Sequence, residues 1–253
     1  MATERLHKIL AAAGIDSRRN CELIILEGLV RVNGRIVDTL PAFADIDKDI
    51  ITVGGKKIRF AKKVYYLLNK PKSVICTNYD PAGRRKAVDL IGSDQRIFCI
   101  GRLDTDTAGA IILTNDSALA NLLTHPRYGL EKTYLVEIKG RITPDAIEKL
   151  KKGVWLAEGK SMLAKLKILR ATEKQSLLEI KVRQSLNRQI QRIMAKFGYK
   201  VTSIKRTHIG KISLERLALG DYRPLTAAEI NYLKKEDRPE SLNSGAKRRL
   251  KTH

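Results

Sequence analysis

Cysteine and histidine are scarce in this chain of 253 residues. The three cysteines, Cys21, Cys76 and Cys99, are widely spaced and form no Cys-x-x-Cys pair. The four histidines show no His-Glu-x-x-His or other paired spacing. A zinc site needs such spacing, and an odd number of widely spaced cysteines fits free thiols. The sequence therefore predicts free thiols in a reducing cytoplasm and no metal site.

Long apolar runs are also missing. No stretch reaches the roughly 18 apolar residues that a membrane-spanning helix needs. Near the N-terminus, basic residues flank only the short apolar run 9–13, which is not the pattern of a signal peptide. We therefore expect a cytoplasmic protein that makes no membrane contact.

Acidic residues are in deficit. The chain has 27 Asp and Glu against 49 Lys and Arg, a formal net charge of +22. Between positions 180 and 214 there are nine Lys or Arg and no Asp or Glu at all. An excess of this size indicates a polyanionic partner, and a nucleic acid fits better than a membrane surface. The acid-free stretch is the clearest candidate for phosphate contacts.

Residues 1–61 have the pattern of a small domain. Apolar residues recur at helical spacing over 6–13, and a second helix is expected after Asp16 or Ser17, since either side chain can cap it. An Asn33-Gly34 pair between two apolar runs then predicts a tight β-hairpin. Residues 62–63 are expected to link this unit to the next.

Residues 64–232 are predicted to form a second domain, of the α+β class, built on a mostly antiparallel sheet. A polar, basic tail over 234–253 is expected to be disordered and to contact RNA non-specifically. Strands are expected over 64–68, 74–77, 97–100, 110–113, 134–138, 165–169 and 177–182, and helices over 118–123, 144–150 and 187–197.

The most informative segment is 97–116, IFCIGRLDTDTAGAIILTND. Two apolar runs flank a polar turn that begins at Gly101 and carries Asp104 beside Arg102. A turn between strands lies at a sheet edge, where a carboxylate can meet a ligand. In a cationic setting that carboxylate stays ionised, and it can attack or stabilise an electrophilic carbon.

The motif GRLDTDTAG followed by IILTND resembles the catalytic signature of the pseudouridine synthases that modify ribosomal RNA, in the branch with an N-terminal S4-like RNA-binding domain. The resemblance runs from about residue 4 to 225. It implies an S4-like domain, a long bent sheet with a cleft between its halves, and isomerisation of a uridine without any cofactor. It also implies that Asp104 is the catalytic residue. The absence of P-loop and dinucleotide-binding motifs agrees with a cofactor-free reaction.

Further site residues follow from the same resemblance. Lys132-Thr133-Tyr134 is similar to the family's Lys-x-Tyr motif, whose Tyr lies on the flipped uracil, and Lys132 would contact RNA. Arg102 would fill the space the base leaves or hold a phosphate, because a base must leave its stack before its glycosidic bond can be reached. Arg18 and Arg19 start the helix that contacts RNA phosphates in the S4-like domain.

The segment 187–193, NRQIQRI, resembles the family pattern Asn-Arg-Gln-Val-Arg-Arg-Met. It places Arg188 among the RNA-binding residues and Gln191 and Arg192 among the substrate-binding ones. Gln191 stands where the pattern has the basic partner of the catalytic carboxylate. A salt bridge would there become an ordinary hydrogen bond, unless Arg192 or another basic residue compensates.

Three interpretations remain at this point. The first is a monomeric rRNA pseudouridine synthase acting on ribosomal RNA or a ribosomal assembly intermediate, and the run 80–84 resembles the B-type enzymes that modify the large ribosomal subunit. The second is a non-catalytic RNA-binding assembly factor, which the altered partner Gln191 favours. The third is a metal-dependent nuclease using Asp104, Asp106 and Asp116. Asp106 is otherwise expected to be structural.

Overall fold

The computed structural model describes residues 3–124, 129–184 and 186–235. The expectation for the tail from residue 236 onward therefore lies outside the described residues.

The N-terminal unit has its own core. Helices α1 (Leu6–Ala12) and α2 (Arg18–Leu26) pack on a sheet with strand order β3-β2-β5-β6. Ser17 caps α2, its hydroxyl accepting from the Asn20 N–H at 3.1 Å. Asn33 and Gly34 both have positive φ, 52° and 83°, as a two-residue hairpin turn between β2 and β3 requires. The strands are β1 (Glu4–Arg5), β2 (Val30–Val32), β3 (Arg35–Val37), β4 (Phe43–Ala44), β5 (Ile51–Val53) and β6 (Lys56–Lys57).

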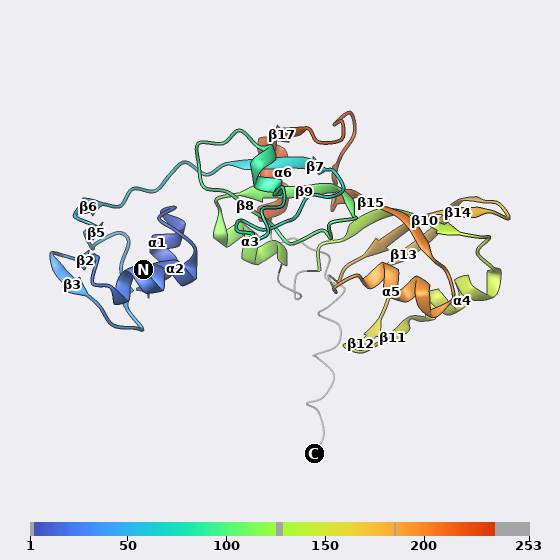
Figure 1. Ribbon diagram of the computed structural model, residues 1–253, viewed down its shortest axis with the longest axis horizontal. Helices are drawn as coiled ribbons and strands as arrows, with labels where there is room; N and C mark the ends of the chain where they lie inside the picture. Colours follow the sequence, from blue (N-terminus) through green and yellow to red (C-terminus); the bar gives the residue numbers. More distant parts are fainter. Residues whose placement is uncertain (1–2, 125–128, 185, 236–253) are drawn as a thin grey trace, which may run out of the picture.

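The rest of the described chain is organised around one large sheet (Figure 1). Within the described residues it has nine strands, in the order β13-β14-β10-β15-β9-β7-β17, with β8 and β16 at the side of this path. The strands are β7 (Tyr65–Lys70), β8 (Phe98–Cys99), β9 (Ala108–Thr114), β10 (Lys132–Lys139), β13 (Lys165–Ala171), β14 (Gln175–Val182), β15 (Val201–Ile209), β16 (Ile212–Ser213) and β17 (Tyr222–Pro224).

The sheet consists of two halves that meet where β9 pairs with β15. Among the pairings in the described part of this sheet, it is the one parallel contact, and it joins only Lys205 to Ala108 and Arg206 to Gly109. Gly109 has φ +114°, and a Cβ there would lie 2.1 Å from the Arg206 carbonyl oxygen. The two strands can approach this closely only because position 109 has no side chain.

Each half of the sheet carries its own helices. In the half that contains β7 and β9, helices α3 (Ser117–Thr124) and α6 (Ala227–Lys234) pack against one face, while the loops around the 3₁₀ turn η1 (Ala87–Leu90) cover the other. Strand β9 is therefore buried on both faces and reads as a continuous apolar run. In the other half, α4 (Pro144–Lys152), α5 (Gln189–Lys196) and the hairpin β11 (Val154–Leu156) and β12 (Gly159–Ser161) pack on β10 and β14.

The predicted α+β class with a mostly antiparallel sheet is confirmed. The strand expected at 74–77 is wrong, because Ile75 makes only an isolated bridge to Lys86 and the partner segment turns into η1 one residue later. The helix expected over 187–197 is shorter, since Arg188 adopts a left-handed conformation (φ +46°) and α5 begins only at Gln189.

The separate cores of the two units support the domain limits 1–61 and 64–232, which stay our proposal. Within the described residues, each helix is too short or too polar to cross a bilayer.

Candidate active site

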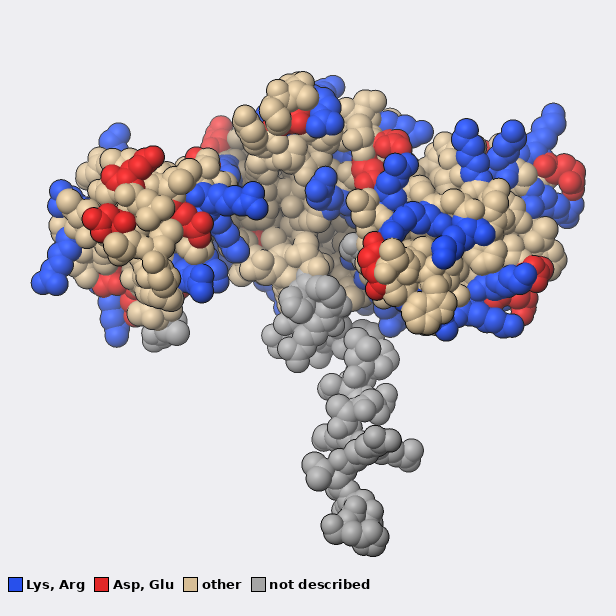
Figure 2. Space-filling model, turned by 60° about the horizontal axis from the view of Figure 1, so that its bottom comes forward, with Lys and Arg blue, Asp and Glu red and all other residues tan. Residues whose placement is uncertain are grey.

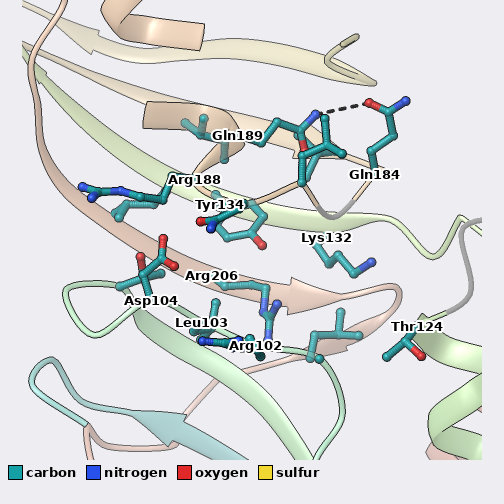
Figure 3. Close-up of a pocket in the computed structure, with 18 of the residues that line it drawn as sticks. Arg102, Leu103, Asp104, Thr124, Lys132, Tyr134, Gln184, Arg188, Gln189 and Arg206 are labelled. Carbon is teal, nitrogen blue, oxygen red and sulfur yellow. Dashed lines mark hydrogen bonds between the residues drawn. The ribbon is translucent and has the colours of Figure 1, made fainter. Parts of the chain in front are cut away.

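A cavity of about 410 Å³ opens where the two halves of the large sheet meet. Its described lining comes from the loop before β9, from β10 and β15, and from the start of α5 (Figure 3). These elements are far apart in sequence, and only the β9–β15 contact brings them together. The cavity contains the candidate residues Asp104, Arg102, Lys132, Tyr134, Arg188 and Gln191.

The loop of Asp104 is held by its neighbours. Gly101 takes the positive φ (+73°) that starts the turn, and the side chain of Leu103 is buried. The Thr107 N–H donates to the Asp104 carbonyl at 3.0 Å, and the Ser73 N–H donates to the Thr105 carbonyl at 2.8 Å. These contacts fix the backbone and leave the Asp104 carboxylate, which is only half-buried, directed at the cavity.

The Asp104 carboxylate has little contact with other side chains. The Gln191 amide nitrogen lies 3.5 Å from Oδ2, longer than an ordinary hydrogen bond. None of the ion pairs between residues that the structure describes includes Asp104. Gln191 therefore lies in the predicted place and, being neutral, forms a weak polar contact instead of an ion pair.

The charge of the cavity is positive. Asp104 is the one acidic side chain among the described lining residues, against four basic ones, Arg102, Lys132, Arg188 and Arg206. Arg188 also reaches Asp106 at 3.8 Å, with both side chains mostly exposed. A ligand with several negative charges is favoured here, and the open edge of the cavity is solvent-accessible enough to admit one.

Tyr134 supplies an aromatic face. It lies on β10 directly opposite Arg206 of β15, and its half-buried ring projects into the cavity between Asp104 and Lys132 (Figure 3). A flat base can stack on such a ring, a contact worth roughly 1–3 kcal/mol in nucleic-acid binding proteins.

Arg206 is the lining residue that the sequence patterns missed. Its side chain is only 4 % exposed, Nε donates to the Ala110 carbonyl, and Nη2 is buried without a hydrogen-bond partner among the described residues. A buried guanidinium nitrogen without an acceptor is costly, so this atom is suited to an oxygen of a bound ligand. The usable signal was the adjacent pair Lys205-Arg206 within the acid-free stretch 180–214.

Arg192 lies elsewhere. Its guanidinium binds the Glu158 carboxylate through Nη1 at 3.0 Å, and this ion pair lowers the pKa of Glu158 below its usual value. Arg192 is not among the described residues that line the cavity, so its charge does not replace the one missing at Gln191.

Arg18 and Arg19 lie on the N-terminal unit, exposed in the first turn of α2. The neighbouring Asp16 carboxylate lies 3.7 Å from the Arg96 guanidinium, which links the two units on this side. Figure 2 shows Lys and Arg side chains both on this unit and on the part of the large domain around α5, with a hollow between them. A long polyanion that entered the hollow would thus meet basic groups on both sides.

Asp106 and Asp116 do not join Asp104 in one cluster. The Asp106 side chain is exposed, whereas Asp116 lies past the far end of β9 and caps α3. In the residues that the structure describes, there is no group of three His, Cys, Asp or Glu side chains placed to hold a metal ion. The carboxylates on which the nuclease interpretation depended are therefore separated.

Comparisons with known proteins agree with this geometry. Residues 64–196 match the family model for RNA pseudouridylate synthase, and residues 4–40 match the S4 domain. The ribosomal large subunit pseudouridine synthase B of Bacillus subtilis is 40% identical over 91% of this chain and 96% of its own length. An RNA pseudouridine synthase of Aquifex aeolicus is 38% identical over 92% of this chain and 94% of its own.

A solved structure of the same family is also similar to this chain. The crystal structure of a pseudouridylate synthase superposes with a TM-score of 0.67 at 28% identity and covers 90% of this chain and 99% of its own. The expected S4-like domain and the expected catalytic fold are both confirmed. The chain is a member of the RNA pseudouridylate synthase family, in the branch with an N-terminal S4 domain.

Proposed function

We propose that this protein isomerises a specific uridine of large-subunit ribosomal RNA to pseudouridine, with Asp104 as the catalytic residue and without a cofactor. The observation that carries the proposal is a cavity in which Asp104 is the one carboxylate among the described lining residues, beside four cationic side chains and the ring of Tyr134. The names of the relatives in Bacillus subtilis and elsewhere support the large subunit as the target.

The chemistry needs one ionised carboxylate near the ribose. The bond between C1′ and N1 of uracil breaks and positive charge develops on the sugar. The base then turns and rejoins through C5, which loses its proton while N1 gains one, as the family's reaction requires. Asp104 either attacks C1′ or removes a proton at C2′, and its position at the cavity serves both routes. The Nη2 of Arg206 is placed to donate to a carbonyl oxygen of the detached uracil anion, which stabilises that charge.

The remaining residues hold the substrate. Tyr134 stacks on the flipped base, and Arg102, exposed at the cavity edge, replaces the base in the RNA stack or binds its phosphate. Lys132 and Arg188 bind flanking phosphates, and Arg18 and Arg19 bind RNA on the S4 domain. We infer that the protein acts as a cytoplasmic monomer, because its substrate is ribosomal RNA and one chain supplies every proposed group.

Gln191 gives the non-catalytic alternative its one specific support. The 3.5 Å contact to Asp104 is weaker than an ion pair would be. A factor that had lost catalysis would still bind RNA through the same cations. The competing interpretation therefore predicts unchanged RNA affinity together with no pseudouridine.

The test is pseudouridine mapping on ribosomal RNA incubated with the full-length protein. Wild type is expected to produce a modified uridine at one position, and Asp104→Ala none, while RNA binding is retained by both. Asp106→Ala is the matched control, because Asp106 is exposed two residues away, and it should modify normally. Wild type that binds RNA but modifies nothing would establish the assembly-factor interpretation instead.

A further inference from the structure

Two cysteines lie together behind the loop of Asp104. Cys76 follows the turn after β7, and Cys99 ends β8, which runs beside β9 (Figure 1). The Asn78 amide nitrogen donates to the Ile97 carbonyl at 2.5 Å, which holds the two segments side by side, and both cysteines are half-buried against the same apolar cluster. Cys76 also lines a cleft that it shares with Asp104 and Arg188, so small molecules can approach its sulfur.

Cys76 is tied directly to the catalytic loop. Its Sγ accepts a hydrogen bond from the Leu103 N–H at 3.4 Å, one residue before Asp104. The loop thus depends on Cys76 for one of its backbone partners, because that N–H has no carbonyl acceptor in its place.

A buried ammonium group faces the pair. The Lys70 side chain is fully buried, and Nζ donates to the carbonyls of Pro71 and Val74 at 2.9 and 2.7 Å. Burial lowers the pKa of Lys70, and the charges of Cys76, Cys99, Asp106 and Asp104 oppose this effect. A buried cation is stabilised by a nearby anion, and the thiolate of Cys76 can supply it.

The same surroundings shift the pKa values of the two thiols in opposite directions. The hydrogen bond from Cys99 lowers the pKa of Cys76, against the effect of burial, with help from the Leu103 N–H, Lys70 and Arg206. The pKa of Cys99 is raised by its bond to Cys76 and by burial. Cys76 is therefore the nucleophile of the pair and Cys99 the thiol that resolves it.

We propose that Cys76 and Cys99 form a redox-sensitive dithiol, which a small disulfide oxidises to an intramolecular bond that releases the loop of Asp104. The Cys76 thiolate attacks one sulfur of the small disulfide, whose S–S bond breaks and one thiolate leaves. Cys99 then loses its proton to that thiolate and attacks Cys76 Sγ, which expels the second. Two protein thiols are oxidised and one small disulfide becomes two thiols.

The consequence lies at Leu103. A disulfide sulfur carries no negative charge and is a poorer acceptor than a thiolate, so the Leu103 N–H loses its partner and Lys70 loses a charge that opposes the effect of its burial. The residue that follows is Asp104. The link from oxidation to catalysis rests on the proposed function, whereas the disulfide and the loop release do not.

The experiment treats the full-length protein with oxidised glutathione. Peptide mapping should find Cys76 joined to Cys99, with Cys21 still reduced because it is fully buried. Hydrogen exchange at the Leu103 amide should become about tenfold faster. Pseudouridine formation should fall by a similar factor, and dithiothreitol should reverse both changes.

Three variants control this result. Cys99→Ser should stop at a glutathione adduct on Cys76, Cys76→Ser should form neither adduct nor bond, and Cys21→Ala should behave as wild type. The proposal is overturned if the bond between Cys76 and Cys99 does not form or if the adduct appears on Cys99 instead. It is also overturned if hydrogen exchange at the Leu103 amide is unchanged in the oxidised protein. Reduced wild type that forms no pseudouridine refutes the proposed function alone, since mapping and exchange are read without it.

Discussion

Strand β9 has an aspartate beyond each of its ends, and the two carboxylates differ in burial and in the number of their hydrogen-bond partners. Asp116 is 3 % exposed, and its oxygens accept from the Tyr65 hydroxyl at 2.8 Å, from Lys63 at 3.2 Å and from two N–H groups of α3. Asp104 is half-buried and has the single 3.5 Å contact to Gln191. Both belong to one short motif, yet only one carboxylate has unused acceptor capacity.

This difference indicates that Asp116 serves the stability of the fold and Asp104 the chemistry of the site. Hydrogen bonds saturate the oxygens of Asp116, so that side chain holds β7 and α3 together and has nothing left for a ligand. Asp104 faces a cavity and cationic side chains, which leave its oxygens open to a ligand. Function is expected at the end where the carboxylate has only one weak contact and keeps acceptor capacity for a ligand.

The largest effect is expected from Asp104→Asn. The amide has the same shape but neither attacks C1′ nor removes a proton, so turnover should fall roughly 10⁴-fold, as for other essential catalytic groups. The melting temperature should stay within about a degree, since no strong contact is lost. Single-turnover assays and thermal melts measure the two quantities. A large drop in melting temperature would mean that Asp104 is a structural residue like Asp116.

Arg206→Lys comes second. The ammonium keeps the charge but cannot place a donor where Nη2 lies, and removing one preorganised donor costs on the order of 10² in rate. The loss should appear in kcat more than in KM, because the donor acts on charge that develops during the reaction. Arg188→Lys is the matched control, since Arg188 is exposed at the edge of the cavity. Equal losses in both variants would show that the cavity needs only net charge.

Gln191→Arg tests the weak partner of Asp104. A guanidinium at this position can form a charge-assisted pair with the carboxylate and fix its orientation, so we expect turnover to rise by about threefold to tenfold. Gln191→Leu should lower it by a few-fold. Rates measured at saturating RNA distinguish this from a change in affinity. Wild-type turnover in both variants would mean that Asp104 needs no partner at this position.

Much of this arrangement could be predicted from the sequence. Features that depend only on neighbouring residues were predicted correctly. The Asn33-Gly34 turn, the Ser17 cap and the apolar runs of β7 and β9 are all present as expected. Motif resemblance also led to Asp104, Tyr134 and the position of Gln191, which the structure brings into one cavity. Their roles in the reaction remain proposals.

What escaped prediction depends on long-range packing. Strand β15 lies in the middle of the sheet, but bulges interrupt its register and a buried Arg206 replaces an apolar residue, so its alternation is lost. The direction of Arg192 toward Glu158 depends on the β11–β12 hairpin, 34 residues earlier. The pairing of Cys76 with Cys99 likewise arises only when β8 joins β9. No pattern within a single segment contains such contacts.

The smallest effect on activity, and the clearest on stability, is expected from Asp116→Asn. Burial raises the pKa of Asp116, but the bonds from Tyr65, Leu119 and Lys63 outweigh it and bring the pKa below the ordinary 3.8. A carboxyl group with a lowered folded-state pKa stabilises the protein above its unfolded pKa, and this contribution disappears as the pH falls through the folded value. The variant should therefore lose about 1–2 kcal/mol near pH 7.

That loss corresponds to a melting temperature about 3–6 °C lower, and it should shrink below roughly pH 4 as wild type becomes protonated too. Turnover per folded molecule should be unchanged, because β9 keeps Asp104 and Asp116 on the order of 20 Å apart. Asp106→Asn, on the exposed side of the loop, should shift neither quantity. If Asp116→Asn instead slowed turnover without lowering the melting temperature, the two ends of β9 would be coupled, and the separation between the binding end and the structural end would not hold.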